Sequence, residues 1–259
     1  MAGEQVFERY ELKYWVPRRV ADQVVASLAS SHGGHMVEDE IARRAGATQI
    51  NTSLYFDSPR FTFLEQHVYG SPDRIKLRVR FYGEEPGGPC FFEIKRRQSA
   101  VVMKKRAIVL YARTQWLLHD LSQHVPPEEV QGADALEQFQ YLAMRTQAEP
   151  KLLVRARRLA LRAVEPGVDV RVTVDTDIAW QPPRAPDVLV PRPDLWRMLG
   201  AQEGVLDGRA LIEVKFRNSR PWWLADAANV LGDYRVSFSK YVASALEARA
   251  DPFFRFDAA

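Results

Sequence analysis

Basic residues occupy every second position from residue 74 to residue 80, within the segment 73–82. They are Arg74, Lys76, Arg78 and Arg80, and the residues between them are apolar. Alternate residues of a β-strand share a face, so this spacing predicts a strand with one cationic and one apolar face. Cations on one strand face repel each other by about 1 kcal/mol per close pair even in water. Because solvated faces usually mix both signs, the row favours a surface that binds an anion.

Other segments carry charged rows with the same spacing. The rows are Arg9, Glu11 and Lys13; Glu93, Lys95 and Arg97; Lys104 and Arg106; Arg171, Thr173, Asp175 and Asp177; and Glu213, Lys215 and Arg217. A sheet that curls so that these faces converge would form a barrel lined with cations. Such an interior requires a strongly anionic guest. Phosphate chains meet this requirement, because guanidinium and ammonium groups both pair with phosphoryl oxygens.

Carboxylates are interspersed among these cations, at Glu11, Glu93, Asp175 and Glu213. Ion pairing with a neighbouring Lys or Arg is the more common role for any one of them. The alternative is that one or two hold a divalent cation that bridges phosphates, since Mg²⁺ and Mn²⁺ suit carboxylates combined with phosphate oxygens. Both roles stay open from the residues alone.

Strands must position these side chains. Alternation predicts strands at 7–16, 48–57, 73–82, 90–97, 102–111, 151–164, 169–178, 188–190 and 209–217. Helical patterns predict helices at 20–30, 61–69, 115–125, 135–147, 221–232 and 239–250. The sequence therefore predicts an α+β fold, an antiparallel barrel of about eight strands with helices packed outside. We expect residues 1–259 to form a single domain.

The composition is that of an ordinary globular protein. Hydrophobic residues make up 46% of the 259 residues, charged residues 27%, and the net charge is +3. No apolar run approaches a transmembrane length and the first residues resemble no secretion signal, so we expect no direct membrane insertion, and any membrane link would need a partner in trans. The single cysteine, Cys90, excludes an intramolecular disulfide and is expected in the core. The predicted location is cytoplasmic.

Taken in chain order, the motifs resemble those of the VTC (vacuolar transporter chaperone) domain, the polyphosphate-polymerase branch of the CYTH-like triphosphate tunnel metalloenzymes. The motifs are RYELKYWV at 9–16, SLYFDSP at 53–59, RIKLRVRFYG at 74–83, FFEIKRR at 91–97, MKKRAIV at 103–109, VRARRLAL at 154–161, VRVTVDTDI at 170–178, LIEVKF at 211–216 and FSKY at 238–241. Each piece alone is common, but the ordered set is specific and covers nearly the whole chain. The resemblance implies a tunnel of about eight antiparallel strands.

The resemblance also implies roles for individual residues. Positions that match its phosphate-binding residues are Lys13, Arg78, Arg80, Lys95, Lys104, Arg106, Arg158, Arg171 and Lys240, and of these we expect Lys13, Arg78, Arg80, Lys95 and Lys240 to be catalytic. The charged rows add Lys76 and Lys215 to the phosphate-binding set. Glu213 matches the carboxylate that holds Mn²⁺ or Mg²⁺, and the candidates for a second carboxylate are Glu11, Glu93 and Asp175.

The activity implied is a metal-dependent phosphotransferase. It would transfer the γ-phosphoryl group of ATP, or of another triphosphate, to an inorganic polyphosphate chain held in the tunnel. Two alternatives stay open: a tripolyphosphatase or organic triphosphatase, and a non-catalytic polyphosphate-binding module. Arg9 stands where tunnel phosphatases carry the first Glu of E-x-E-x-K, which counts against the hydrolase. No nucleic acid is expected as a partner, because aromatic residues do not alternate with the cations. The sequence also lacks P-loop and Rossmann glycine motifs.

Overall fold

The structure is a computed structural model that describes residues 9–29, 35–39, 49–99, 101–201, 208–217 and 221–251. The chain divides into two compact units, each built from three segments. Unit 1 comprises Met1–Gln49, Ala156–Ile178 and Gly200–Phe238, and unit 2 comprises Ile50–Arg155, Ala179–Leu199 and Ser239–Ala259. Strands β8 (Glu149–Ala163) and β9 (Val170–Gln181) run from one unit into the other. That residues 1–259 act as one domain stays a prediction.

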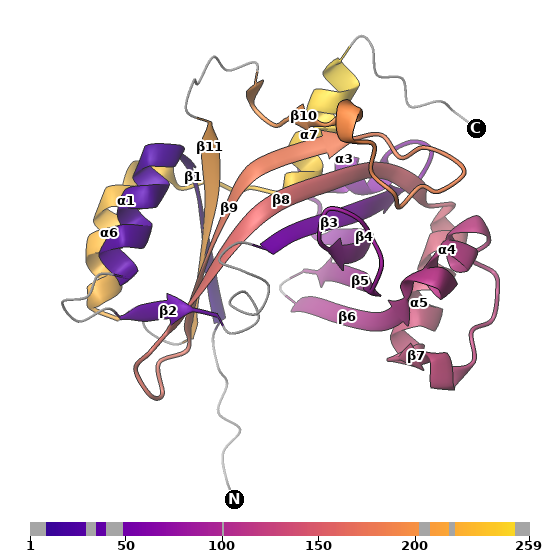
Figure 1. Cartoon of the computed structure of the whole chain (residues 1–259), viewed down its shortest axis with the longest axis horizontal. Coiled ribbons are helices and arrows are strands. Elements are labelled where there is room, and N and C mark those ends of the chain that lie inside the picture. Colours follow the sequence, from indigo (N-terminus) through magenta and orange to yellow (C-terminus); the bar gives the residue numbers. More distant parts are fainter. Residues whose placement is uncertain are drawn as a thin grey trace, which may run out of the picture. The chain divides into compact units, whose positions relative to one another are not determined.

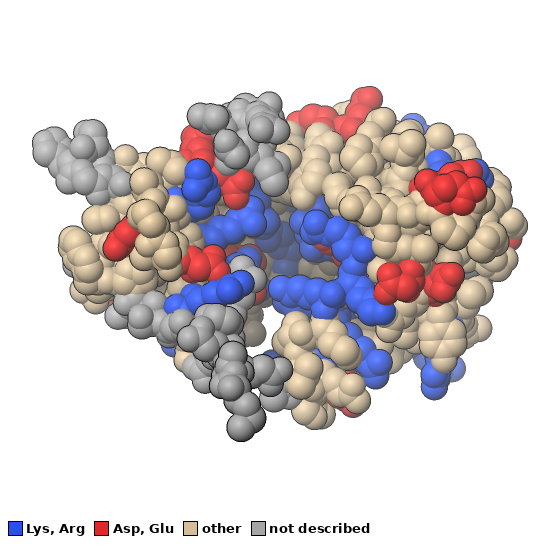
Figure 2. Space-filling view, turned by 90° about the horizontal axis from the view of Figure 1, so that it is seen from below, with Lys and Arg blue, Asp and Glu red and all other residues tan. Residues whose placement is uncertain are grey.

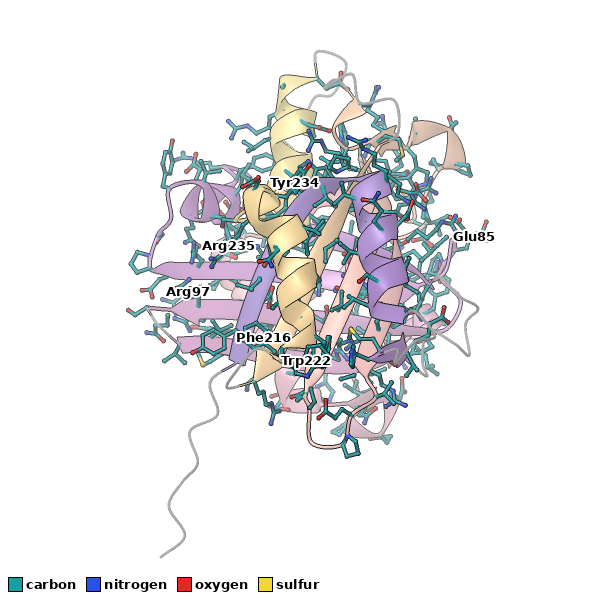
Figure 3. The ribbon with its side chains drawn as sticks, turned by 90° about the vertical axis from the view of Figure 1, so that its left-hand side faces the viewer. Glu85, Arg97, Phe216, Trp222, Tyr234 and Arg235 are labelled. Atoms are coloured by element: carbon teal, nitrogen blue, oxygen red, sulfur yellow. The ribbon has the colours of Figure 1, made fainter. Side chains whose placement is uncertain are left out.

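Unit 1 is built on the strand order β1-β11-β9-β8, in which β1 is Arg9–Pro17 and β11 is Arg209–Arg217. The short strand β2 (Met36–Glu38) pairs with β8. Two helices cover this sheet, α1 (Arg18–Ala29) and α6 (Trp223–Leu231), and they pack on each other. Figure 3 shows them side by side in front of the strands, with Trp222 at the start of α6 and Tyr234 beyond its end.

Unit 2 continues with the order β8-β3-β4-β5-β6-β7. Its further strands are β3 (Gln49–Asp57), β4 (Asp73–Tyr82), β5 (Pro89–Gln98), β6 (Val101–Leu110), β7 (Val130–Gln131) and β10 (Arg197–Met198), which pairs with β9. Its helices are α3 (Thr62–Val68), α4 (Tyr111–His119), α5 (Ala133–Thr146) and α7 (Lys240–Ala250), as Figure 1 shows. Short 3₁₀ turns lie at Pro127–Glu129 and Pro193–Leu195, and unit 1 has one at Gly232–Tyr234.

The predicted fold class is confirmed: the protein is α+β, and the strand pairs with a described register are antiparallel. Eight strands have nine residues or more, and three strands of two or three residues complete an eleven-stranded sheet. The strand order begins at β1 and ends at β7, so hydrogen bonds between described strands do not close it. No described helix is long and apolar enough to span a membrane.

The strand predicted at 188–190 is wrong. These residues form a turn, which Asp187 holds by accepting hydrogen bonds from the backbone amides of Leu189 (3.1 Å, to the carboxylate) and Val190 (3.3 Å, to the carbonyl). An Asp that bonds the backbone two residues further on stabilises a turn in place of a strand. A run of three apolar residues was too short to reveal this.

Each unit has its own hydrophobic core. In unit 2 the apolar face of β4, formed by Leu77, Val79 and Phe81, is at most 1% exposed. This face belongs to the same cluster as Phe139 of α5, and α5 packs on β5 and β6. Cys90 also lies in this core, as expected. The helices therefore cover the apolar face, and the basic residues between these positions lie on the opposite face of the sheet.

Candidate functional site

The lysines of three neighbouring strands form one row across unit 2. Lys76 of β4 stands opposite Lys95 of β5, and Lys95 stands opposite Lys104 of β6. Like charges directly opposite each other destabilise a sheet. Lys105, the next residue along, points to the other side, where it pairs with Asp134 of α5 at 3.2 Å. The predicted row of Lys104 and Arg106 on one face of β6 is therefore confirmed, and the lysine row is a place where a bound polyanion would relieve repulsion.

Glu93, on the same face as the lysine row, contacts the three arginines Arg78, Arg80 and Arg106. Its two oxygens accept hydrogen bonds from Arg78 Nε and Arg106 Nη2, both at 2.6 Å, and Arg80 Nη2 lies 3.4 Å away. Burial alone would raise the pKa of Glu93, but the three guanidinium groups lower it to about 2. One carboxylate therefore serves three cations, which leaves this face strongly positive.

Arg80 has a hydrogen-bond donor that is buried and has no acceptor in the described structure. Its side chain is only 12% exposed, and its Nε has no hydrogen-bond partner in the described structure. Burial and the neighbouring Arg78 lower the pKa of the Arg80 guanidinium. A buried donor without a partner costs about 1–3 kcal/mol. An anionic oxygen placed at this face would satisfy that donor.

A tyrosine completes this corner of unit 2. The hydroxyl of Tyr55 accepts a hydrogen bond from Arg78 Nη1 at 3.1 Å, and its ring stacks on Tyr241 at 4.9 Å. Burial alone would raise the pKa of Tyr55, but Arg78, Lys240 and Arg80 lower it below its ordinary value. Lys240 therefore lies close to the Arg78 corner. Tyr55 was not among the predicted site residues, although its place in the motif SLYFDSP, on a strand beside β4, is a usable signal.

Asp57 links the motif SLYFDSP to the motif FSKY in the folded chain. It is fully buried, and its oxygens accept hydrogen bonds at 2.8 Å from the backbone amides of Ser58, Phe63 and Leu64. The Tyr241 hydroxyl donates a further hydrogen bond at 2.6 Å. Asp57 thus anchors α3 and α7 to the end of β3.

The start of α7 is fixed from a second direction. Ser239 is its N-cap, accepting from the Val242 amide at 3.4 Å, and its hydroxyl also accepts from Lys76 Nζ at 2.8 Å. Lys240 is consequently the first residue of a helix whose position is set by Asp57 and by the basic face itself. This local structure accounts for the S-K-Y motif.

His67 of α3 reports the potential near the lysine row. Burial lowers its pKa, Lys76 adds to this, and the value reaches about 4. Arg74 and Lys95 act in the same direction. The ring nitrogen Nδ1 lies 2.7 Å from the Phe63 carbonyl oxygen, so the neutral imidazole donates there. Burial is the main reason why His67 stays neutral, and the three nearby cations add to it, which agrees with a positive potential in this region.

Unit 1 carries a charged face of a different kind. Lys13 Nζ lies 3.2 Å from Glu11 and 3.5 Å from Glu213, and it donates to the Phe238 carbonyl at 2.9 Å. Lys215 contacts Glu213 at 2.8 Å. Burial alone would lower the pKa of Lys13, but Glu213 and Glu11 raise it above its ordinary value. Two lysines and two glutamates therefore balance each other.

Two predicted arginines of unit 1, Arg158 and Arg171, also have carboxylate partners. Arg158 donates to both oxygens of Asp175, at 2.6 and 2.7 Å, and Asp175 is fully buried. Arg171 lies 3.4 Å from Asp39, and its side chain is 45% exposed. Register places Arg171 opposite Lys215 on β11. In this structure Asp175 is an ion-pair partner of Arg158, as Glu93 is of its three arginines.

The sequence predicts a bound Mn²⁺ or Mg²⁺, so side chains of the structure must be able to coordinate such an ion. Within the described ranges, no three or more His, Cys, Asp or Glu side chains are grouped to hold a metal ion. Glu213 is 8% exposed and, with Glu11, surrounds Lys13. Mg²⁺ is usually held by one or two carboxylates together with substrate phosphates. Glu213 and Glu11 therefore fit a cation that shares its coordination with phosphate, and they do not fit a metal centre built from protein alone.

All the predicted site residues lie in described regions, distributed over the two units. Unit 2 holds Lys76, Arg78, Arg80, Glu93, Lys95, Lys104, Arg106 and Lys240, and unit 1 holds Glu11, Lys13, Arg158, Arg171, Asp175, Glu213 and Lys215. Figure 2 shows lysine and arginine side chains on the face of the molecule seen from below. The register confirms that the unit 2 residues on β4, β5 and β6 share a face. Their roles stay predictions.

The α+β fold and its basic strands are consistent with the family to which the sequence is similar. The family model described as VTC domain matches residues 8–247. The chain therefore belongs to the VTC domain family. Membership supports the coarse class that the resemblance implied, a triphosphate-binding enzyme of the CYTH-like tunnel type. No protein with a curated description matches the chain.

Two solved structures are similar over most of their length. A candidate adenylate cyclase from Bacillus halodurans shares 12% identity, covers 90% of this chain and 95% of its own, and has a TM-score of 0.48. A conserved hypothetical protein from Pyrococcus furiosus shares 9% identity, with 91% and 99% covered and a TM-score of 0.38. Likenesses this distant carry no weight for function.

Proposed function

We propose that this protein is a polyphosphate polymerase. It transfers the γ-phosphoryl group of ATP to the end of an inorganic polyphosphate chain, with Mn²⁺ or Mg²⁺. Membership of the VTC domain family supports the class of substrate. The basic face of unit 2 is the observation that carries the proposal.

That face has the charge distribution of a polyanion site. Strands β4, β5 and β6 place eight cations on it, namely Arg74, Lys76, Arg78, Arg80, Lys95, Arg97, Lys104 and Arg106, with the single carboxylate Glu93 among them. Alternate residues lie about 7 Å apart along a strand. The cations are therefore spread along the strands as well as across them, which suits a chain of phosphates better than one isolated phosphate.

The chemistry requires no covalent intermediate on the protein. A terminal oxygen of the polyphosphate attacks the γ-phosphorus, the bond from this phosphorus to the β,γ-bridging oxygen breaks, and ADP leaves with the electron pair. Arg78, Arg80 and Lys95 stabilise the charge on the transferring group, and Lys240 adds a further cation. Holding both reactants in line supplies much of the remaining acceleration.

Unit 1 is assigned the metal. Glu213, with Glu11 beside it, would hold the divalent cation, which when bound neutralises phosphoryl oxygens. Lys13, Lys215, Arg158 and Arg171 are assigned phosphate contacts. The residues of unit 1 hold the cation and the substrate in place and do not act as nucleophiles.

The direct test is incubation of the pure protein with ATP and Mn²⁺. A polymer that stains as polyphosphate on a gel, with release of ADP, is the expected product. Free phosphate without polymer would identify a triphosphatase instead. Binding of polyphosphate without either product would identify a non-catalytic binding module. Either of these two results overturns the polymerase proposal.

A further inference from the structure

The basic face of unit 2 ends in an aromatic pair. Tyr82 of β4 is 37% exposed, and its ring meets that of Phe91 of β5 edge-to-face at 5.3 Å. Phe91 stands directly opposite Arg80 in the register, so it lies on the basic face. Its neighbours Cys90 and Phe92 are fully buried in the core on the other face. Phe91 is thus an aromatic side chain placed among cations and outside the core.

A guanidinium already accompanies this ring. Arg106 lies 5.2 Å from the centroid of Phe91 while it is held by Glu93. On β6, the residue opposite Phe91 is Ile108, which continues the apolar character of this end. An aromatic ring flanked by a fixed guanidinium is a surface on which a planar base stacks.

The face therefore has two different ends. Tyr82 and Phe91 lie toward the hairpin that contains Glu85, whereas Lys76 and Lys95 lie toward the other end, beside Arg97. Figure 3 shows Glu85 and Arg97 at opposite ends of these strands. The arginine row of Arg78 and Arg80 lies between the aromatic pair and the lysine row.

We propose that Phe91 and Tyr82 form a nucleoside subsite, on which the purine base of the nucleoside triphosphate stacks. This inference rests on the proposed function and deepens it. The triphosphate then extends over Arg80 and Arg78, and the polyphosphate chain extends over the lysine row. Because every base has a π-face, stacking discriminates little between bases, so ATP and GTP bind about equally well.

The test compares two ligands that differ only by the nucleoside. ATP and inorganic tripolyphosphate are titrated by calorimetry, without metal, into the wild-type protein and into Phe91→Ala and Phe91→Tyr. Loss of stacking weakens ATP binding to Phe91→Ala about 10-fold, while its tripolyphosphate affinity stays within about 2-fold. Phe91→Tyr keeps the ring and binds both ligands like the wild type.

A second variant covers the case in which Phe91→Ala fails to fold. Tyr82 is the more exposed residue of the aromatic pair. Tyr82→Ala should weaken ATP binding by a few-fold and leave tripolyphosphate binding unchanged. Equal changes for both ligands, or no change for ATP, in a folded Phe91→Ala or Tyr82→Ala protein overturns the nucleoside subsite but leaves the phosphate site standing. Failure of the wild type to bind either ligand overturns the proposed function itself.

Discussion

The two units treat the same residue types in opposite ways. In unit 1, Lys13 and Lys215 are matched by Glu11 and Glu213, and Arg158 is matched by Asp175. In unit 2, Glu93 alone serves Arg78, Arg80 and Arg106. The lysine row Lys76, Lys95 and Lys104 lies on this same positive face.

The difference is that the charges on the unit 1 face are balanced by other protein side chains, whereas the charges on the unit 2 face would be balanced only when an anionic ligand binds. A balanced set of ion pairs contributes to the folded state of the free protein, and each partner has a compensated charge. An unbalanced set is repulsive until anions arrive, and it then gains the most from them. Unit 2 is therefore the region that gains most from bound phosphate, and unit 1 is proposed to position a cation in addition to its own phosphate contacts.

The largest effect is expected in unit 1. Glu213→Gln nearly preserves shape and removes the charge that a divalent cation requires, so metal-dependent transfer should fall by about 10³-fold or more. Binding of tripolyphosphate without metal should be unchanged or tighter, since one repulsive carboxylate is gone. Activity assays and metal-free calorimetry measure the two effects. Full turnover in this variant would make Glu213 an ion-pair partner only, and the metal would then have to bind elsewhere.

The next effect concerns Arg80 of unit 2, whose Nε has no hydrogen-bond partner in the described structure. Arg80→Ala removes a charge-assisted contact, and transfer should fall by about 10²–10³-fold with weaker triphosphate binding. Lys105→Ala is the matched control, because Lys105 lies on the helix-covered side and pairs with Asp134. Its activity should equal that of the wild type. Equal losses in both variants would mean that net charge, and not the basic face, governs the reaction.

The contribution of Glu93 to the stability of unit 2 should depend on pH. The pKa of Glu93 is about 2 in the folded protein, below its unfolded value, so its contribution to stability is present above about pH 5 and is lost as the pH falls toward 2. The shift corresponds to about 3 kcal/mol at pH 7. Glu93→Gln should therefore be less stable than the wild type by about this amount at neutral pH and equally stable near pH 2, as measured by denaturant unfolding. A constant difference across this range would assign the effect to packing.

The smallest effects concern the stability of the free protein, which should fall when a unit 1 lysine is removed but not when a unit 2 lysine is removed. Lys215→Gln removes a partner of Glu213 and should destabilise the free protein by about 0.5–1.5 kcal/mol. Lys104→Gln removes a cation that faces Lys95 and should leave stability unchanged or raise it by a few tenths of a kcal/mol. Urea unfolding of both variants without ligand measures these values. Similar destabilisation by both would contradict the distinction between the two regions.

Most of the fold was predictable because the long strands carry clean alternation. The segment 73–82 was predicted with its observed bounds, and the shared face of Lys104 and Arg106 followed from the same spacing. The three very short strands were missed, because two or three residues cannot show a period. Closure of the sheet could not be decided either, since no local pattern records which strands pair at its ends.

The candidate site was predicted in composition but not in pairing. The row that includes Asp175 was expected to continue to Asp177, yet Asp177 has φ of 50° and a half-exposed side chain that contacts Arg157 at 3.2 Å. One left-handed residue interrupts the period of two, and nothing in the sequence marks where this occurs. That Glu93 would gather three arginines while Glu213 pairs with lysines depends on cross-strand register, which spacing within a single strand does not contain.

The central claim is that the basic face of unit 2 is completed by phosphate, and thermal unfolding with tripolyphosphate in the absence of metal tests it most directly. At about 100 times its Kd, the ligand should stabilise the protein by about 2.7 kcal/mol and raise Tm by about 5–10 °C. The rise should shrink at high salt and be much smaller in Arg80→Ala. An unchanged Tm at millimolar tripolyphosphate in low salt would contradict the account.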